Sequence, residues 1–295
     1  MSGLRPTAPP SAKTGLILVA GAGGLMGRAL VEVLSSEGLT VLGLDHAALD
    51  VTDGPACRRV VEEHQPRWVV NCAAYTQVDR AEDEEERADR LNAQGAANLA
   101  RAAGLVGAKV IYPSTDFVFD GHKDQPYTEG DPPAPLSAYG RSKWAGEIAT
   151  RQENPNHLIL RTSWLFGPHG PNFVNTILRL GRVEEELRIV DDQIGSPTYS
   201  LDLAGALPRI LELELTGVFH LANQGQTSWF GLARRALKAA GLEVRLIPTT
   251  SDRLSRKADR PAFSVLDCRR LGRLGVSLRP WEEAVDDYLA AWGEQ

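Results

Sequence analysis

A tyrosine and a lysine stand four residues apart, at Tyr139 and Lys143, in a stretch whose pattern predicts a helix. Side chains at positions i and i+4 of a helix share a face, so we expect the phenol and the ammonium to meet. A free phenol has a pKa near 10, and a nearby ammonium lowers that pKa by favouring the phenolate. Such a pair can protonate an oxygen that is gaining negative charge. The spacing alone is weak evidence, because it also arises by chance.

A glycine-rich turn upstream gives the pair a context. Gly21, Gly24 and Gly27 follow a short apolar run at 16–20 and open a segment with helical spacing at 24–37. We expect Gly21 to permit a sharp turn, Gly24 to let backbone approach a phosphate, and Gly27 to let the helix pack closely. The helix N-terminus would then bind the pyrophosphate of a dinucleotide. For the glycines alone, a flexible loop is the alternative.

Together, the turn and the pair predict hydride transfer between a nicotinamide cofactor and a carbonyl group. Tyr139 is expected to act as the acid, and Lys143 to hold the nicotinamide ribose. Asp45, at the end of the second predicted strand, is expected to bind the adenosine ribose and to favour NAD. A solvated loop carboxylate is the alternative for Asp45. Because NADP is not excluded, the predicted cofactor is NADPH or NADH.

A further polar group, Ser114-Thr115-Asp116, follows the fourth predicted strand at 108–112. Ligands of open α/β folds bind at the carboxyl ends of the strands. A hydroxyl at that edge can donate a hydrogen bond to a substrate carbonyl oxygen as the oxygen gains charge. A turn or a helix cap is the alternative for this group.

Strand and helix patterns alternate over the first 160 residues. The predicted strands lie at 16–20, 40–44, 68–70, 108–112 and 157–160, and the predicted helices at 24–37, 55–63, about 79–103 and 137–150. Asp53 is a plausible cap for the second helix. This alternation predicts an α/β fold with a Rossmann-like, doubly wound parallel sheet.

Past residue 161 the alternation is less regular, which indicates a smaller C-terminal α/β substrate-binding domain. We therefore expect a disordered tail at 1–15, a dinucleotide-binding domain at 16–165 and a mainly substrate-binding domain at 166–295. A segment at about 199–222, with an apolar run at 217–221, is expected to return to the main sheet.

Composition argues against several classes of partner. The net charge of −6 offers no broad basic field for nucleic acid or an anionic membrane. No apolar run approaches the roughly 20 residues of a membrane span. The three cysteines and six histidines lack metal-binding or disulfide spacing, so we predict no metal and a cytoplasmic location.

Several stretches, taken in order, resemble the extended short-chain dehydrogenase/reductases and, within them, the dTDP-4-dehydrorhamnose reductases. They lie at 71–79, 114–121, 139–147, 161–164, 172–173, 192–198 and 260–264. Each is weak alone, but their order and spacing together are specific. The resemblance covers nearly everything from Leu16 onward. It implies reduction of the 4-keto group of dTDP-4-dehydro-L-rhamnose to dTDP-L-rhamnose.

The resemblance also implies roles for individual residues. The catalytic residues would be Thr115, Tyr139 and Lys143. The cofactor-binding residues would be Gly21, Gly24, Leu25, Met26, Gly27, Asp45, Asp50, Val51, Ala73, Ala74, Tyr75, Thr76, Tyr139 and Lys143. The substrate-binding residues would be Val78, Thr115, Asp116, Tyr139, Trp164 and Asn172. A core aromatic is the alternative for Trp164.

The chain departs from the family pattern at several positions. Phe117 replaces a common tyrosine, and Cys72 replaces a common alanine. Some members form a magnesium-bridged dimer through acidic side chains, but Ala29 and Leu201 stand at the positions that correspond here. Because neither side chain can bind a metal, we predict none there, and we expect a monomer or a weak homodimer.

Two alternatives of other classes stay open. One is a non-catalytic regulatory subunit of the same fold, the role of a relative that serves methionine adenosyltransferase. The other is a reductase or epimerase acting on another nucleotide deoxysugar. Nucleotide-sugar binding is common to the second alternative and to the predicted reductase.

Overall fold

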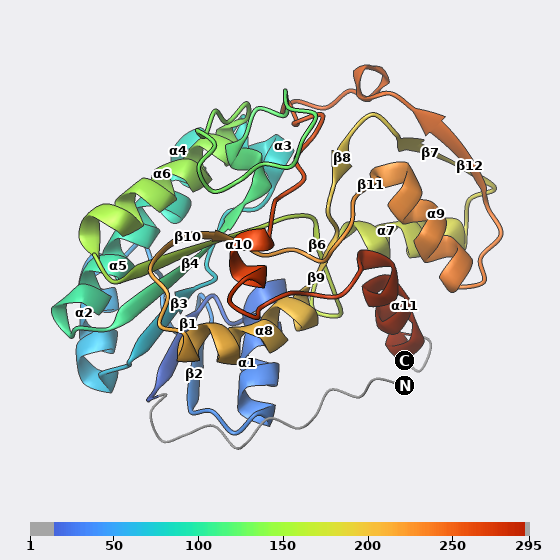
Figure 1. Cartoon of the computed structure of the whole chain (residues 1–295). Coiled ribbons are helices and arrows are strands. Elements are labelled where there is room, and N and C mark those ends of the chain that lie inside the picture. Colours follow the sequence, from blue (N-terminus) through green and yellow to red (C-terminus); the bar gives the residue numbers. More distant parts are fainter. Residues whose placement is uncertain (1–14, 293–295) are drawn as a thin grey trace.

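The computed structural model describes residues 15–292, drawn in colour in Figure 1. All but the last residue of the predicted tail at 1–15 lies outside these residues. The centre is a six-stranded sheet in the order β10-β5-β4-β3-β1-β2, and every pairing in it is parallel. Its strands are β1 (Ile17–Ala20), β2 (Val41–Leu44), β3 (Trp68–Asn71), β4 (Lys109–Thr115), β5 (His157–Thr162) and β10 (Gly217–His220).

Helices cover both faces of this sheet (Figure 1). One face packs against α1 (Leu25–Ser36) and α8 (Ser200–Glu212), and the other against α2 (Gly54–His64) and α5 (Gly95–Leu105). The strand residues alternate accordingly: Ile17 and Val19 face α1 and α8, whereas Leu18 and Ala20 face α2 and α5. Fully buried parallel strands require such continuous apolar runs. The doubly wound prediction is confirmed.

The second predicted helix has the expected cap. Asp53 Oδ1 accepts a hydrogen bond from the backbone N–H of Ala56 at 3.0 Å, at the start of α2. Pro55 lies in the first turn of the helix, where its missing N–H costs nothing.

The predicted helical stretch over about 79–103 is helical for most of its length but is not one regular helix. The segment forms α3 (Val78–Ala81), α4 (Glu85–Asp89), a π-helical turn η1 (Arg90–Gln94) and then α5. The carbonyl of Asn92, inside the π turn, accepts a hydrogen bond from the Tyr112 hydroxyl at 3.1 Å. Periodicity could not reveal this interruption, because its cause is a contact with strand β4.

The fourth strand is longer than predicted. Strand β4 continues through Ser114 and Thr115, which pair in register with Arg161 and Thr162 of β5. The 3-10 turn η2 (Asp116–Val118) follows directly, and helix α6 (Ala138–Glu153) begins after the Ser137 cap. Thr115 is therefore held by the sheet rather than by a loop.

The C-terminal part lies beyond the sheet, on the side where the strands end (Figure 1). It contains α7 (Phe173–Gly181), α9 (Trp229–Ala239), α11 (Trp281–Trp292) and a 3-10 turn η3 (Ser251–Arg253). Helix α10 (Arg269–Gly272) lies instead against the main sheet, where Leu271 joins the apolar cluster of α1 and α8. The short strands of the C-terminal part are β6 (Leu165–Phe166), β7 (Glu186–Val190), β8 (Ile194–Gly195), β9 (Thr198–Tyr199), β11 (Thr227–Ser228) and β12 (Arg245–Thr249). Two apolar clusters that contain Phe166 and Ile177 form its core. Strand β10 pairs with β5 and so returns this part of the chain to the main sheet.

Two helical glycines give a matched test of the turn that opens α1. A Cβ on Gly27 would lie 2.2 Å from the Gly21 carbonyl oxygen, whereas a Cβ on Gly205 of α8 would meet nothing within 4 Å. We predict that Gly27→Ala lowers the free energy of unfolding by about 1–3 kcal/mol through overpacking. Gly205→Ala should raise it by about 0.5–1 kcal/mol. Urea unfolding of both variants measures this, and equal effects would contradict the close packing at Gly27.

Candidate active site

The glycine turn lies where the strand order of the sheet reverses. Strand β1 has β2 on one side and β3 on the other, and ligands of such folds bind at this switch point. Gly21 has φ +75°, and a Cβ there would lie 2.4 Å from the backbone nitrogen of Ala73. Gly24 caps α1 with no side-chain hydrogen bond and no acidic residue in the first turn. The turn therefore presents an open helix N-terminus, which suits a phosphate group.

The predicted adenosine-side residues lie at the end of β2 and in the loop after it. Asp45 follows β2 directly and is exposed, with Oδ1 accepting the N–H of Ala48 at 3.0 Å. Asp50 accepts hydrogen bonds from the N–H and hydroxyl of Thr52, which lower its pKa. Val51 packs its side chain into the core, so only its backbone is available to a ligand.

The loop after β3 runs beside the glycine turn and contains Ala73, Ala74, Tyr75 and Thr76. Asn92 holds this loop in place: its Oδ1 accepts the Tyr75 N–H at 2.8 Å, and its Nδ2 donates to the Tyr75 carbonyl at 3.1 Å. The same Nδ2 lies 2.9 Å from Ser142 Oγ on α6. Sequence reasoning missed Asn92, because its partners are distant in the chain.

The end of β4 carries a buried hydroxyl–carboxylate chain. Thr115 Oγ1 donates to Asp116 Oδ1 at 3.0 Å, and Ser264 Oγ donates to Asp116 Oδ2 at 2.6 Å. Burial raises the pKa of Asp116 to about 6, although these two hydrogen bonds act to lower the pKa. A hydroxyl has a single hydrogen, so Thr115 bonded in this way can only accept further hydrogen bonds. The expected donation from Thr115 to a substrate oxygen requires this hydrogen to turn away from Asp116.

Tyr139 and Thr115 lie together, as expected, and share a side-chain hydrogen bond. Burial raises the pKa of Tyr139 to about 12, and the negative charge of Asp116 acts in the same direction. The expectation that Lys143 lowers this pKa is wrong for this structure. The phenol is consequently protonated at neutral pH, as a proton donor must be.

Lys143 is directed instead toward strand β4. Its Nζ donates to the Pro113 carbonyl at 2.7 Å and lies 4.1 Å from the centre of the Tyr112 ring. Burial lowers the pKa of Lys143 to about 8, while the Glu147 carboxylate favours the charged form. A buried ammonium with such a pKa is a common feature of active sites.

Two of the other predicted substrate residues, Val78 and Trp164, lie in separate segments. Val78 opens α3 and is partly buried. Trp164 has φ +47°, which is uncommon for a bulky residue, and it stacks on Trp229 with ring centres 3.5 Å apart. A Cβ on Gly195 would lie 2.4 Å from the Trp164 ring, so the indole is packed closely against that backbone.

Asn172 is a helix cap in this structure. Its Oδ1 accepts the Asn175 N–H at 3.0 Å, and its Nδ2 donates to the carbonyls of Gly167 and Gly170. These bonds use the side chain's polar atoms to shape the start of α7.

Within residues 15–292, no group of three or more His, Cys, Asp or Glu side chains is arranged to bind a metal. In the same part of the chain, no helix has both the length and the apolar character that a bilayer span requires.

An open helix N-terminus at the switch point, with a threonine at the end of β4 and a tyrosine and a lysine on α6, defines a dinucleotide-dependent oxidoreductase of the extended short-chain type. The family described as RmlD substrate binding domain matches residues 15–293. The chain belongs to this family, the family of the dTDP-4-dehydrorhamnose reductases. The resemblance inferred from the sequence is confirmed.

Individual relatives match over almost their whole length. A dTDP-4-dehydrorhamnose reductase of Mycolicibacterium smegmatis is 44% identical, covering 93% of this chain and 85% of the relative. A dTDP-4-keto-6-deoxy-D-glucose reductase of Streptomyces niveus is 38% identical, covering 91% and 94%. A solved dTDP-4-dehydrorhamnose reductase of Bacillus anthracis, in complex with NADP, is 38% identical with a TM-score of 0.92, covering 94% and 99%.

The buried Asp116 carboxylate yields a prediction about stability. Its pKa is about 6 in the folded chain and near 3.8 when unfolded, so the folded chain binds the extra proton between these values and loses stability as the pH rises through them. At about 1.4 kcal/mol for each of roughly two units, the cost at pH 7 is on the order of 3 kcal/mol. Asp116→Asn should therefore be more stable than the parent at pH 7, with the gain vanishing near pH 4.

Asp131 provides the matched control for this prediction. Its pKa is lowered because it accepts hydrogen bonds from Lys123 and Thr128. Asp131→Asn should therefore lose stability at pH 7. Denaturant unfolding of both variants at pH 4 and 7 measures the two effects, and a loss of stability at pH 7 in Asp116→Asn would contradict the burial cost.

Proposed function

We propose that this chain reduces the 4-keto group of dTDP-4-dehydro-L-rhamnose to the alcohol of dTDP-L-rhamnose, using NADPH or NADH. The observation that carries the proposal is the shared position of Tyr139, Thr115 and Lys143 at the end of β4, beside the glycine turn of β1. Full-length relatives with this activity support the choice of substrate.

The residues of the glycine turn fit a dinucleotide. The positive φ of Gly21 and the absence of a Cβ at Gly27 bring the turn and α1 together, and the N-terminus of α1 is open. When bound, the cofactor supplies the hydride that reduces the ketone. Gly24, Leu25 and Met26 would hold the pyrophosphate.

The remaining cofactor residues would bind other parts of the dinucleotide. Asp45 would bind the adenosine ribose, Asp50 and the backbone of Val51 would lie near the adenine, and Ala73 to Thr76 would line the path between. NADPH is supported by the Bacillus anthracis relative, which is in complex with NADP.

Tyr139 would protonate the carbonyl oxygen as that oxygen gains charge. The phenol is the suitable acid because its raised pKa keeps it protonated at pH 7, while the alkoxide formed in the reduction is a much stronger base. Thr115 would accept a hydrogen bond and fix the direction of the phenol, with Asp116 fixing Thr115 in turn. Lys143 would bind the nicotinamide ribose.

The substrate would lie between the end of β4 and the C-terminal part. Trp164 would offer its indole to the sugar nucleotide, and Val78 and Asp116 would border the deoxysugar. Asn172 would act by shaping the start of α7. Under this proposal residues 16–165 bind the cofactor, and residues 166–295 mainly bind the substrate.

The assembly and location of the protein are further parts of the proposal. We propose a monomer or weak homodimer that works in the cytoplasm, where the free thiols of Cys57, Cys72 and Cys268 stay reduced.

A second candidate is a reductase for another dTDP-4-ketosugar. It is supported by the Streptomyces niveus relative, whose name specifies dTDP-4-keto-6-deoxy-D-glucose. The test is to follow NADPH and NADH absorbance with both ketosugar nucleotides and to identify the products by NMR. Consumption of one cofactor per dTDP-L-rhamnose formed supports the first candidate. No consumption with either substrate would favour a regulatory subunit or an epimerase.

Removal of the phenolic hydroxyl tests the acid. We predict that Tyr139→Phe lowers kcat by about 10²–10⁴-fold while NADPH binding is retained, because only the proton donor is lost. Stopped-flow absorbance and cofactor titration measure the two effects. Tyr127→Phe is the control, because its hydroxyl donates to Asp120, which is not one of the proposed site residues. Near-normal turnover by Tyr139→Phe would remove the tyrosine from the reaction.

Truncation of Trp164 tests the substrate side. Trp164→Ala should raise KM for the sugar nucleotide about tenfold or more, because a stacking surface is lost, while KM for NADPH stays close to the parent value. Trp164→Phe should recover part of the affinity. If steady-state kinetics gave an unchanged KM for the sugar nucleotide, Trp164 would lie outside the site.

A further inference from the structure

A buried ion pair lies directly behind the catalytic side chains. Glu147 and Arg161 form two hydrogen bonds of 2.8 Å, and their side chains are 0% and 2% exposed. Glu147 lies on α6, one turn beyond Lys143, and Arg161 lies on β5, which pairs with β4. A buried ion pair often stabilises a fold no better than apolar side chains of the same size. Stability alone therefore does not account for it.

Glu147 has a third partner that connects it to the site. Ser114 Oγ donates to Glu147 Oε1 at 2.6 Å. Ser114 stands between Pro113, whose carbonyl accepts from Lys143, and Thr115, which bonds Tyr139. The Glu147 carboxylate therefore connects helix α6 to Ser114, which lies between Pro113 and Thr115 in strand β4.

Glu147 also supplies the negative charge that favours the Lys143 ammonium. From its own helix Lys143 faces Glu147, from β4 it faces Tyr112, and from the segment after β3 it faces Cys72. Burial raises the pKa of Cys72 to about 12 and that of Tyr112 well above its usual value, so both are neutral near pH 7. The charge that opposes the burial of Lys143 comes from Glu147.

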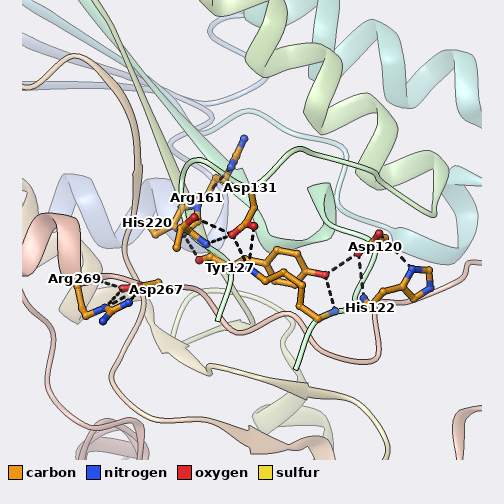
Figure 2. A network of polar contacts seen from close by, with 10 residues as sticks. Asp120, His122, Tyr127, Asp131, Arg161, His220, Asp267 and Arg269 are labelled. Atoms are coloured by element: carbon orange, nitrogen blue, oxygen red, sulfur yellow. Dashed lines mark hydrogen bonds and ion pairs between the residues drawn. The ribbon is translucent and has the colours of Figure 1, made fainter. Parts of the chain in front are cut away.

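The Arg161 end of the ion pair contacts a buried histidine, His220. Arg161 Nη1 lies 3.5 Å from His220 Nε2, and His220 Nδ1 lies 3.0 Å from the Tyr127 carbonyl oxygen. Figure 2 shows Arg161, His220 and Tyr127 near one another within the polar network. Burial and the Arg161 charge lower the pKa of His220 to about 3. His220 therefore stays neutral throughout the pH range in which Lys143 titrates.

We propose that Glu147 is a positioning residue for the reduction: it keeps Lys143 charged and, through Ser114, fixes Lys143 relative to Thr115. The role in reduction rests on the proposed function, but the effect on Lys143 does not. A glutamine at this position would keep the size of the side chain, remove the charge and leave Arg161 without its counter-charge.

The direct test is the titration of Lys143 followed by NMR of the lysine side-chain carbons. The full chain, which has six lysines, is labelled with ¹³C-lysine. The signal that is missing from a Lys143→Arg variant is assigned to Lys143. We expect a midpoint near pH 8 in the parent and a midpoint at least about one unit lower in Glu147→Gln. An unchanged midpoint in folded Glu147→Gln overturns the charge role. The readout needs no turnover, so it stays separate from a failure of the proposed function.

Two further variants decide the outcome if Glu147→Gln does not fold. Glu147→Asp keeps the charge, so the Lys143 midpoint should stay near pH 8, and a fall of one unit would count against the proposal. Ser114→Ala removes the tie to β4 while the ion pair remains. It should lower kcat about tenfold with little change in the Lys143 midpoint. Wild-type kcat in Ser114→Ala would overturn the positioning role.

Discussion

The burial of charge at the carboxyl edge of the sheet is the constraint on which this structure depends. Asp116, Lys143, Glu147 and Arg161 are all at most 4% exposed. A buried charge requires hydrogen bonds or a counter-charge, so each of these groups restricts the position of its partners. Strands β4 and β5, helix α6 and the segment around Ser264 meet at this edge because their side chains complete these bonds.

The same burial sets the chemistry of the site. It moves the pKa of Asp116 up to about 6 and that of Lys143 down to about 8, so that both groups titrate close to neutral pH. It also keeps Tyr139 protonated, with a pKa of about 12. Strong shifts of this kind cost stability and are typical of catalytic groups. A phenol held as an acid beside a dinucleotide turn is the arrangement that reduction of a ketone requires.

The sequence predicted those parts of the molecule that depend on local geometry. The turn at Gly21 and the cap at Asp53 follow from backbone requirements within a few residues, and both are present. The parts that depend on distant partners could not be predicted. The π turn at Asn92 is tied to strand β4, and Ser264 reaches Asp116 from 148 residues away. The rise in the pKa of Tyr139 could not be predicted for the same reason, since burial outweighs any influence of Lys143.

The central claim is that hydride and proton are delivered to the two ends of one carbonyl group at the end of β4. The most direct measurement uses NADPH deuterated at C4 of the nicotinamide, with dTDP-4-dehydro-L-rhamnose as substrate and NMR of the product. The account predicts deuterium at C4 of dTDP-L-rhamnose, with one cofactor oxidised for each sugar formed. The experiment is run with two cofactor samples, each deuterated on one face of C4. Product without deuterium in both samples, or no product at all, would contradict the account.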